Sequence, residues 1–129
     1  FVAAKDYLRN LKARGIQKDH ILQSSTLMLL DKNNMTRQYI DDYLQENQII
    51  IKDSIDISDM DLLIDFARIG VGVACVIKNF VREDLENGTL VEIPLGFPIH
   101  KREVGFAYKT TTKPSKSLAE FIHFYKTYR

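Results

Sequence analysis

The chain has little of what marks a membrane, secreted or nucleic-acid-binding protein. Its 129 residues include one cysteine, so no disulfide can form within the chain and a reducing compartment is expected. The longest clean apolar run, Val71–Ile77, is far shorter than the ~20 residues of a membrane-spanning helix. Basic side chains number 18 and acidic ones 17, and this balance argues against a dedicated nucleic-acid surface.

The first residues also lack a targeting signal. Phe1–Lys5 has no charged start followed by an apolar core, so it is not a signal peptide. There is no initiator Met, and Phe1–Ala3 is typical of the end of a strand. We therefore expect a fragment of a longer chain.

What is present suits one globular domain, with 45% hydrophobic residues. Apolar runs and amphipathic stripes alternate along the chain, which predicts an α/β fold with a largely parallel sheet. The apolar run 71–77 is typical of a central strand covered by helices on both faces. Pro94–Pro98 is the clearest boundary. Helices are expected over 4–14, 36–47, 58–69, 79–86 and from Ser117, and strands over 26–30, 48–51, 71–77, 89–93 and 103–108.

The sequence offers no convincing catalytic, metal or cofactor motif. Gly70 and Gly72 close a helix and open a strand, whereas a dinucleotide fingerprint follows a strand and opens a helix. Cys75 lies mid-strand among apolar residues, which favours a role in the core over reactivity. The histidines are scattered and have no partner at metal-ligand spacing. We expect neither a metal nor a cofactor, although a dispersed catalytic triad stays open.

The best polar candidates lie where a predicted strand gives way to a helix. Asn33, Asn34 and Thr36 follow the strand 26–30, and Ser58 precedes the helix 58–69. Open α/β sheets bind ligands at such carboxyl ends, and the amides of a helix start favour anions. The alternative is that Asn34, Thr36 or Ser58 only caps a helix. For Ser58, with Asp61 completing a short capping box, capping is the stronger reading.

Residues 54–95 carry a longer pattern. A Ser-started apolar helix is followed by Ile69-Gly-Val-Gly-Val-Ala74, Val76-Ile77 and then Leu85-Glu-Asn-Gly-Thr-Leu-Val91. In order and spacing this resembles the effector-binding domain of LysR-type transcriptional regulators. Phe1–Leu8, Thr26–Tyr43 and Lys101–Tyr128 match further family segments. One departure is Ile77-Lys78, where family members often carry a proline after the buried strand, so a binding role for Val76 or Ile77 is not inferred.

The resemblance implies a lobe of periplasmic-binding-protein type II, with a mostly parallel sheet flanked by helices. Residues 1–96 would form the second lobe of the effector-binding domain, and 97–129 the strand and helix that return toward the first lobe. The parent would be a cytoplasmic regulator in which a small effector between the lobes alters DNA binding by a winged helix-turn-helix absent from this chain. Neither catalysis nor membrane association is implied.

The resemblance implies a cleft between two lobes and an interface between two domains. From their shared position between a strand end and a helix start, we expect Asn33, Asn34, Thr36 and Ser58 to line the effector cleft. The helix 36–47 and the strand 48–52 would form the edge at which two domains meet in a homodimer or tetramer, with the interface residues Tyr39, Ile40, Tyr43, Leu44, Ile49 and Ile51. Two rivals remain: a lobe of an extracytoplasmic solute-binding protein, which a signal peptide on the parent would support, and a fragment of an α/β enzyme.

Overall fold

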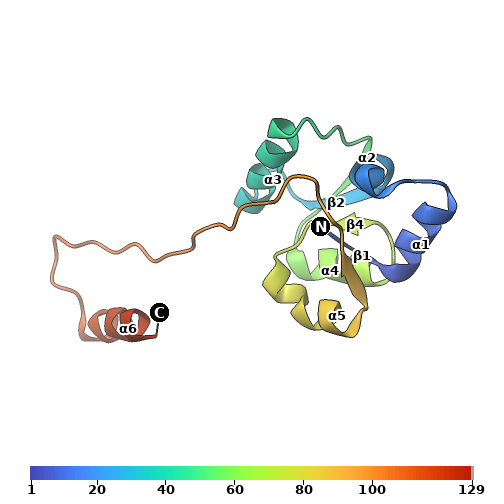
Figure 1. Cartoon of the computed structure of the whole chain (residues 1–129). Helices are drawn as coiled ribbons and strands as arrows, with labels where there is room; N and C mark the ends of the chain where they lie inside the picture. The colour runs from blue at the N-terminus through green and yellow to red at the C-terminus, as the bar shows by residue number, and fades with distance from the viewer. Residues whose placement is uncertain (129) are drawn as a thin grey trace. The chain divides into compact units, whose positions relative to one another are not determined.

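The computed structural model describes residues 1–128 and divides into two units, Phe1–Ile99 and His100–Arg129. The first unit holds one five-stranded sheet with the strand order β3-β2-β4-β1-β5 (Figure 1). Its strands are β1 (Val2–Ala4), β2 (Thr26–Leu30), β3 (Asp53–Ile57), β4 (Val73–Ala74) and β5 (Leu90–Glu92). Its helices are α1 (Lys5–Ala13), η1 (Lys18–His20), α2 (Ile21–Ser24), α3 (Met35–Glu46), α4 (Met60–Arg68), η2 (Lys78–Val81) and α5 (Arg82–Asn87).

The sheet is mixed, and β1 is its only reversed strand. β2 pairs in parallel with β3 and β4, while β1 pairs antiparallel with β4 and β5. Hence β2, β3, β4 and β5 all run in one direction, and their carboxyl ends meet at one edge of the sheet. This confirms the predicted α/β class and the mostly parallel sheet.

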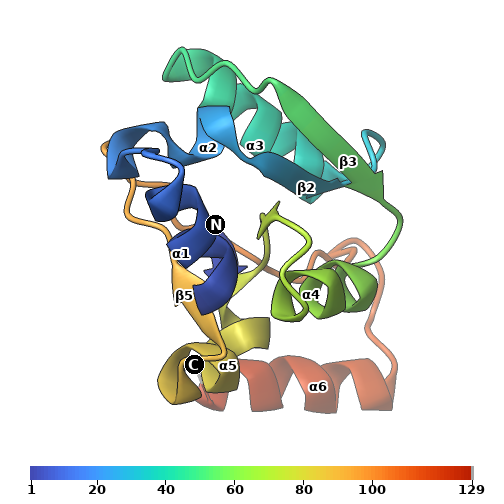
Figure 2. The ribbon, with the colours of Figure 1, turned by 90° about the vertical axis from the view of Figure 1, so that its right-hand side faces the viewer.

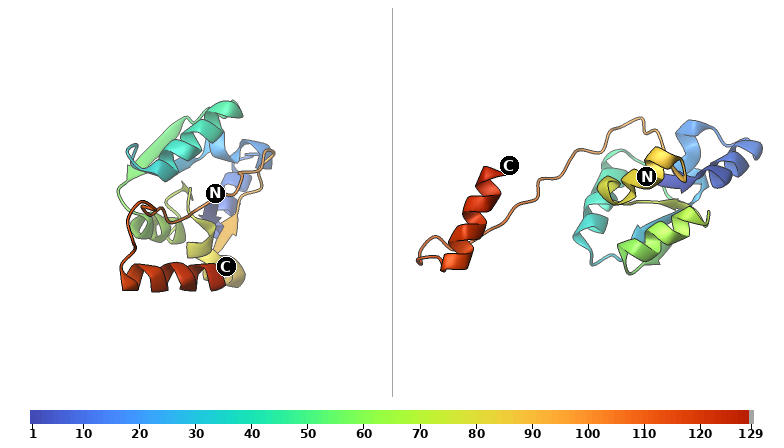
Figure 3. Two further views of the ribbon diagram at one scale, coloured as in Figure 1. Left: turned by 90° about the vertical axis from the view of Figure 1, so that its left-hand side faces the viewer. Right: turned by 90° about the horizontal axis from the view of Figure 1, so that it is seen from below.

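Helices cover both faces of the sheet, and alternation along β2 explains the layering. Leu27 and Leu29 belong to a buried cluster with side chains of α1, α2 and α3, whereas Met28 and Leu30 belong to a second cluster with α4. Successive strand residues point to opposite faces, so one apolar strand supplies two cores. Figures 2 and 3 show α3 and α4 on opposite sides of β2.

Several predicted elements are present with small shifts of their ends. β2 has the predicted bounds, and α1, α3 and α5 lie where helices were expected. Gly70 ends the α4 segment with a φ of +83°, a left-handed conformation that glycine adopts without strain. Cys75 is buried, as predicted.

The predicted strand 48–51 is wrong. Gln48 has a φ of +55°, and the amide of Ile49 donates to the carbonyl of Leu44, so the chain turns as α3 ends. Ile49 and Ile51 pack against the α1–α3 core from a loop. The strand is β3, further along, where pairing runs in register from Thr26↔Asp53 to Leu30↔Ile57.

Two further expectations need correction around α4. Ser58 does not cap this helix, because Asp59 is the N-cap and its Oδ1 accepts from the Leu62 amide at 2.8 Å. Part of the apolar surface of this helix is exposed, since Leu62 is 41% exposed and Ile69, at the C-cap, is 74% exposed. The predicted strand 71–77 shrinks to β4, because only Val73 and Ala74 pair with β2, and of these two Ala74 alone also pairs with β1.

The second unit contains α6 (Lys116–Thr127). Its N-cap is Ser115, which accepts from the amide of Leu118 at 3.3 Å, and not the predicted Ser117. The predicted strand 103–108 is not formed, since no strand within residues 1–128 pairs with it. Instead Phe106 packs edge-to-face on Phe121 at 5.0 Å between ring centroids. In the described part of the chain, no helix combines the length and apolarity needed to cross a bilayer.

Candidate functional site

The predicted polar residues gather at the carboxyl edge of the sheet. Asn33 and Asn34 follow the end of β2, and Ser58 follows directly on β3. Leu30 and Ile57 are the last register pair of these two strands, so the segments that follow them leave the sheet side by side. The exits from β4 and β5 lie at the same edge. Ligands of open α/β sheets bind in this position.

Each predicted residue has a distinct local role. Asn34 caps α3, with its Oδ1 accepting from the Thr36 amide at 2.8 Å. The capping alternative therefore holds for Asn34, and one amide of the helix start is already satisfied. Thr36 is half-buried, while the side chains of Asn33 and Ser58 are exposed. Exposed polar groups at this edge are accessible to a ligand.

Arg37 organises this edge, and it was missed as a site residue. Its side chain is only 7% exposed. Nη1 donates to the Leu30 carbonyl at 2.8 Å and to Asp56 Oδ1 at 2.6 Å, which ties the first turn of α3 to the ends of β2 and β3. Nε donates to Asp41 Oδ1 at 2.8 Å. Burial alone would lower the pKa of Arg37, but the hydrogen bonds to the two carboxylates raise it.

A signal for Arg37 did exist in the sequence. Arg37 and Asp41 are four residues apart, the spacing at which side chains meet on a helix. The second carboxylate, Asp56, comes from another strand and had no local signal. Since the guanidinium is charged and held on three sides, Arg37 fixes where α3 begins relative to the sheet edge.

Most of the expected interface residues are buried in the core of the first unit. Ile40, Tyr43 and Leu44 are each less than a tenth exposed, and they pack in the α1–α3 cluster. Tyr39, Ile49 and Ile51 are half-buried against the same cluster. The apolar stripe of α3 therefore covers the sheet and leaves little apolar surface for an interface with another chain. Tyr43 also donates from its hydroxyl to the carbonyl of Phe97 at 2.5 Å.

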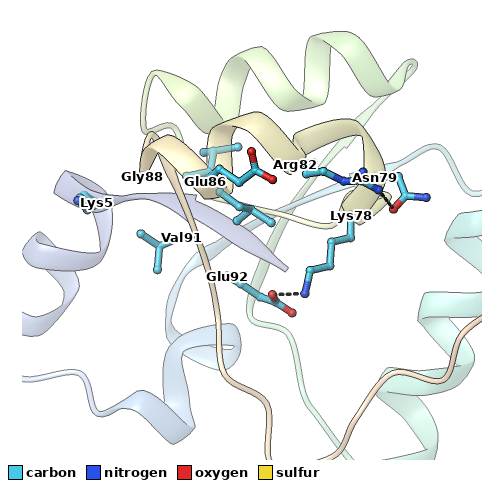
Figure 4. Close-up of a pocket in the computed structure, with 10 residues that line it drawn as sticks. Lys5, Lys78, Asn79, Arg82, Glu86, Gly88, Val91 and Glu92 are labelled. Carbon is cyan, nitrogen blue, oxygen red and sulfur yellow. Dashed lines mark hydrogen bonds and ion pairs between the residues drawn. The ribbon is translucent and has the colours of Figure 1, made fainter.

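Two concave regions lie elsewhere in the first unit. The larger, of about 720 Å³, lies between the η2–α5 segment and β5, and Figure 4 shows the residues around it. The smaller, of about 220 Å³, lies among η1, α2, the end of α3 and the segment 93–97. Asn33, Asn34, Thr36 and Ser58 line neither of them.

Comparisons with known proteins agree on the architecture. A family model described as LysR substrate binding domain matches residues 1–129. Among solved structures, the chain is similar to the regulatory domain of a HypT M206Q mutant from Salmonella typhimurium, with 20% sequence identity and a TM-score of 0.56. The alignment covers 72% of this chain and 44% of that chain, so the present chain spans less than half of that structure's length. No curated protein matches the chain.

Proposed function

Because the chain belongs to the LysR substrate binding domain family, we propose that it forms one wall of the effector site of a LysR-type transcriptional regulator. The observation that carries this proposal is the convergence of Asn33, Asn34, Thr36 and Ser58 at the carboxyl edge of the sheet. Their hydroxyl and amide groups suit a polar or anionic group of a small molecule. The other wall would be the first lobe of the parent protein.

The mechanism would be a shift between two arrangements of the lobes. An effector that contacts both walls binds the closed arrangement more tightly and so increases its population. Arg37 contributes indirectly, since it holds the start of α3 against the sheet. The closed arrangement would alter DNA binding by an N-terminal winged helix-turn-helix, in a cytoplasmic parent protein.

The family match favours one of the function classes. The family comprises regulatory ligand-binding domains, not enzymes, so no catalytic step is assigned. It also favours a regulator over the alternative, a lobe of an extracytoplasmic solute-binding protein. DNA would be contacted only through the N-terminal domain of the parent.

We propose that the parent forms a dimer or tetramer through an edge of this sheet. That edge is β3, in place of the segment 48–52. β3 ends the sheet and pairs only with β2 within residues 1–128. Ile55 on this strand is 40% exposed, and Ile50 in the preceding loop is 76% exposed. An unpaired edge with apolar side chains favours association with another chain.

The effector proposal can be tested in the parent regulator. A panel of small carboxylates and phosphates would be screened for ligands that raise the melting temperature of the protein. Asn33→Ala and Ser58→Ala, both at exposed side chains, should weaken binding of a ligand so found while leaving the melting temperature of the free protein unchanged. Ser54→Ala is the matched control, because Ser54 is an exposed residue near the start of β3, whereas the proposed site follows the last residue of that strand, Ile57. Equal affinity of all three variants and the unchanged protein would refute the assignment.

A further inference from the structure

The concave region between α5 and β5, here called the α5–β5 groove, has the size and the charged lining of a small-molecule binding site. Its volume of about 720 Å³ is within the range of small-molecule sites. Its charged lining comprises Lys5, Lys78, Arg82, Glu86 and Glu92. These residues come from the start of α1, from η2, from α5 and from β5, so the groove exists only in the folded unit.

The charges of the groove are not all neutralised within the protein. Lys78 Nζ and Glu92 Oε2 form an ion pair at 2.6 Å, which removes one charge of each sign. Within residues 1–128, neither Lys5 nor Glu86 has an ion-pair partner. Arg82 makes a single long hydrogen bond, from Nη2 to Asn79 Oδ1 at 3.4 Å. Two cations therefore face one carboxylate, and the balance favours an anion.

The cations stand at separate places along the groove. Figure 4 shows Lys5 beside Gly88 at one end, Lys78 and Asn79 at the other, and Val91 between them. Lys5 Nζ lies 3.1 Å from where a Cβ on Gly88 would stand, so this ammonium lies over the turn that ends α5. The guanidinium of Arg82 presents a planar fork that suits a carboxylate.

The groove also offers an apolar surface. Leu85 and Val91 line it and are half-buried, so part of each side chain remains accessible to a bound molecule. A ligand with an apolar body would remove this surface from water, which a simple inorganic ion would not do. The groove thus combines an apolar floor with a cationic rim.

We propose that the α5–β5 groove binds a small organic anion, with the apolar body against Leu85 and Val91 and the negative group paired with Arg82 or Lys5. None of Asn33, Asn34, Thr36 and Ser58 lines this groove. The ligand class follows from the lining alone and does not depend on the proposed function.

The test is a chemical-shift titration of the ¹⁵N-labelled 129-residue chain at constant ionic strength. Three probes separate the contributions: phenylacetate carries a body and a negative charge, acetate the charge alone, and benzylamine a body with a positive charge. Saturable shifts of the Gly88 and Val91 amides are expected with phenylacetate, weaker ones with acetate and none with benzylamine. Saturation by benzylamine at equal concentration, or shifts that grow linearly with every probe, would overturn the proposal.

Variants then assign the charges. Arg82→Gln or Lys5→Gln should weaken phenylacetate binding about two- to fivefold, the range expected for an exposed charge pair. Glu86→Gln should tighten it, because the repelling carboxylate is removed. Arg9→Gln is the matched control, since Arg9 is an exposed arginine that pairs with Asp6 and does not line the groove. A Glu86→Gln variant that binds more weakly, or an Arg9→Gln effect equal to that of Arg82→Gln, would contradict the assignment.

Discussion

Replacing Gly72 by alanine should be among the most damaging single changes in this chain. A Cβ built on Gly72 would lie 2.4 Å from the carbonyl oxygen of Thr26 and 3.3 Å from its carbonyl carbon. An ordinary contact begins at 3.4 Å, so a separation of about 1 Å more is needed. The obstructing atoms are backbone at the first residue of β2, and they cannot rotate away as a side chain would.

The separation has to come from the sheet itself. Leu27↔Val73 is the neighbouring register pair, so moving Thr26 from Gly72 strains the pairing of β2 with β4 at the centre of the sheet. Overpacking a core typically costs ~1–3 kcal/mol, and a backbone obstruction belongs at the upper end, at about 3 kcal/mol. For a unit of this size, that corresponds to a fall of roughly 12–24 °C in melting temperature.

The assay is urea unfolding followed by far-UV circular dichroism. Gly96→Ala is the matched control, because a Cβ there meets nothing within 4 Å and its φ is not positive. That change should leave the unfolding free energy within about 0.5 kcal/mol of the original. If Gly72→Ala were equally mild, the proposed close approach of β4 and β2 would be refuted.

Three smaller predictions address buried polar groups. Ser25→Ala should raise the unfolding free energy by up to about 1 kcal/mol in a denaturant titration, since the buried Ser25 hydroxyl has no hydrogen-bond partner within residues 1–128. Asp84→Asn should cost about 1 kcal/mol, discounted because the Arg68 side chain paired with it is 43% exposed. The hydrogen bond from Arg68 lowers the pKa of Asp84 in the folded protein. The stability that this pair contributes is therefore present above the unfolded pKa of about 3.9 and is lost as the pH falls through the lower folded value. The unfolding free energy of Asp84→Asn should accordingly fall less steeply in acid than that of the original chain. Burial raises the pKa of the Cys75 thiol to about 11, so a thiol reagent in mildly alkaline buffer should label Cys75 only after unfolding.

The fold was predictable where a segment's own side chains decide its structure. β2 is a short apolar run between polar flanks, and its side chains are buried on both faces of the sheet. Its sequence pattern therefore matches its position in the fold. β3 was missed because it is a polar edge strand: its sequence is Asp-Ser-Ile-Asp-Ile and only Ile57 is buried. The more apolar run Ile49–Ile51 attracted the strand prediction, yet Ile49 and Ile51 pack on the core from a loop and Ile50 is exposed. Residues 53–57 form the strand because they pair with β2, and the local sequence pattern does not indicate which segment pairs with which.

The site residues could likewise be predicted only in part. Position at the end of a strand could be predicted for Asn34 and Ser58, because chain order alone places them there. The exact cap residue could not be predicted, because Ser58 and Asp59 are both good N-caps and the cap depends on the residue at which β3 ends. The α5–β5 groove could not be predicted from the sequence, because Lys5 and Arg82 are far apart in sequence and belong to no common motif.

The reversed strand β1 has a consequence for how the first unit can be moved between proteins. The carbonyl of Phe1 accepts from the amide of Ile93 at 2.8 Å, so the points where the chain enters and leaves this sheet are neighbours. A unit whose ends touch can be inserted into a surface loop of a host protein with little distortion of that loop. The host loses little loop-closure entropy, because its own chain ends stay as close as they were. Residues 1–93 are thus suited to serve as a portable insert, whose stability could report on ligand binding inside an unrelated carrier.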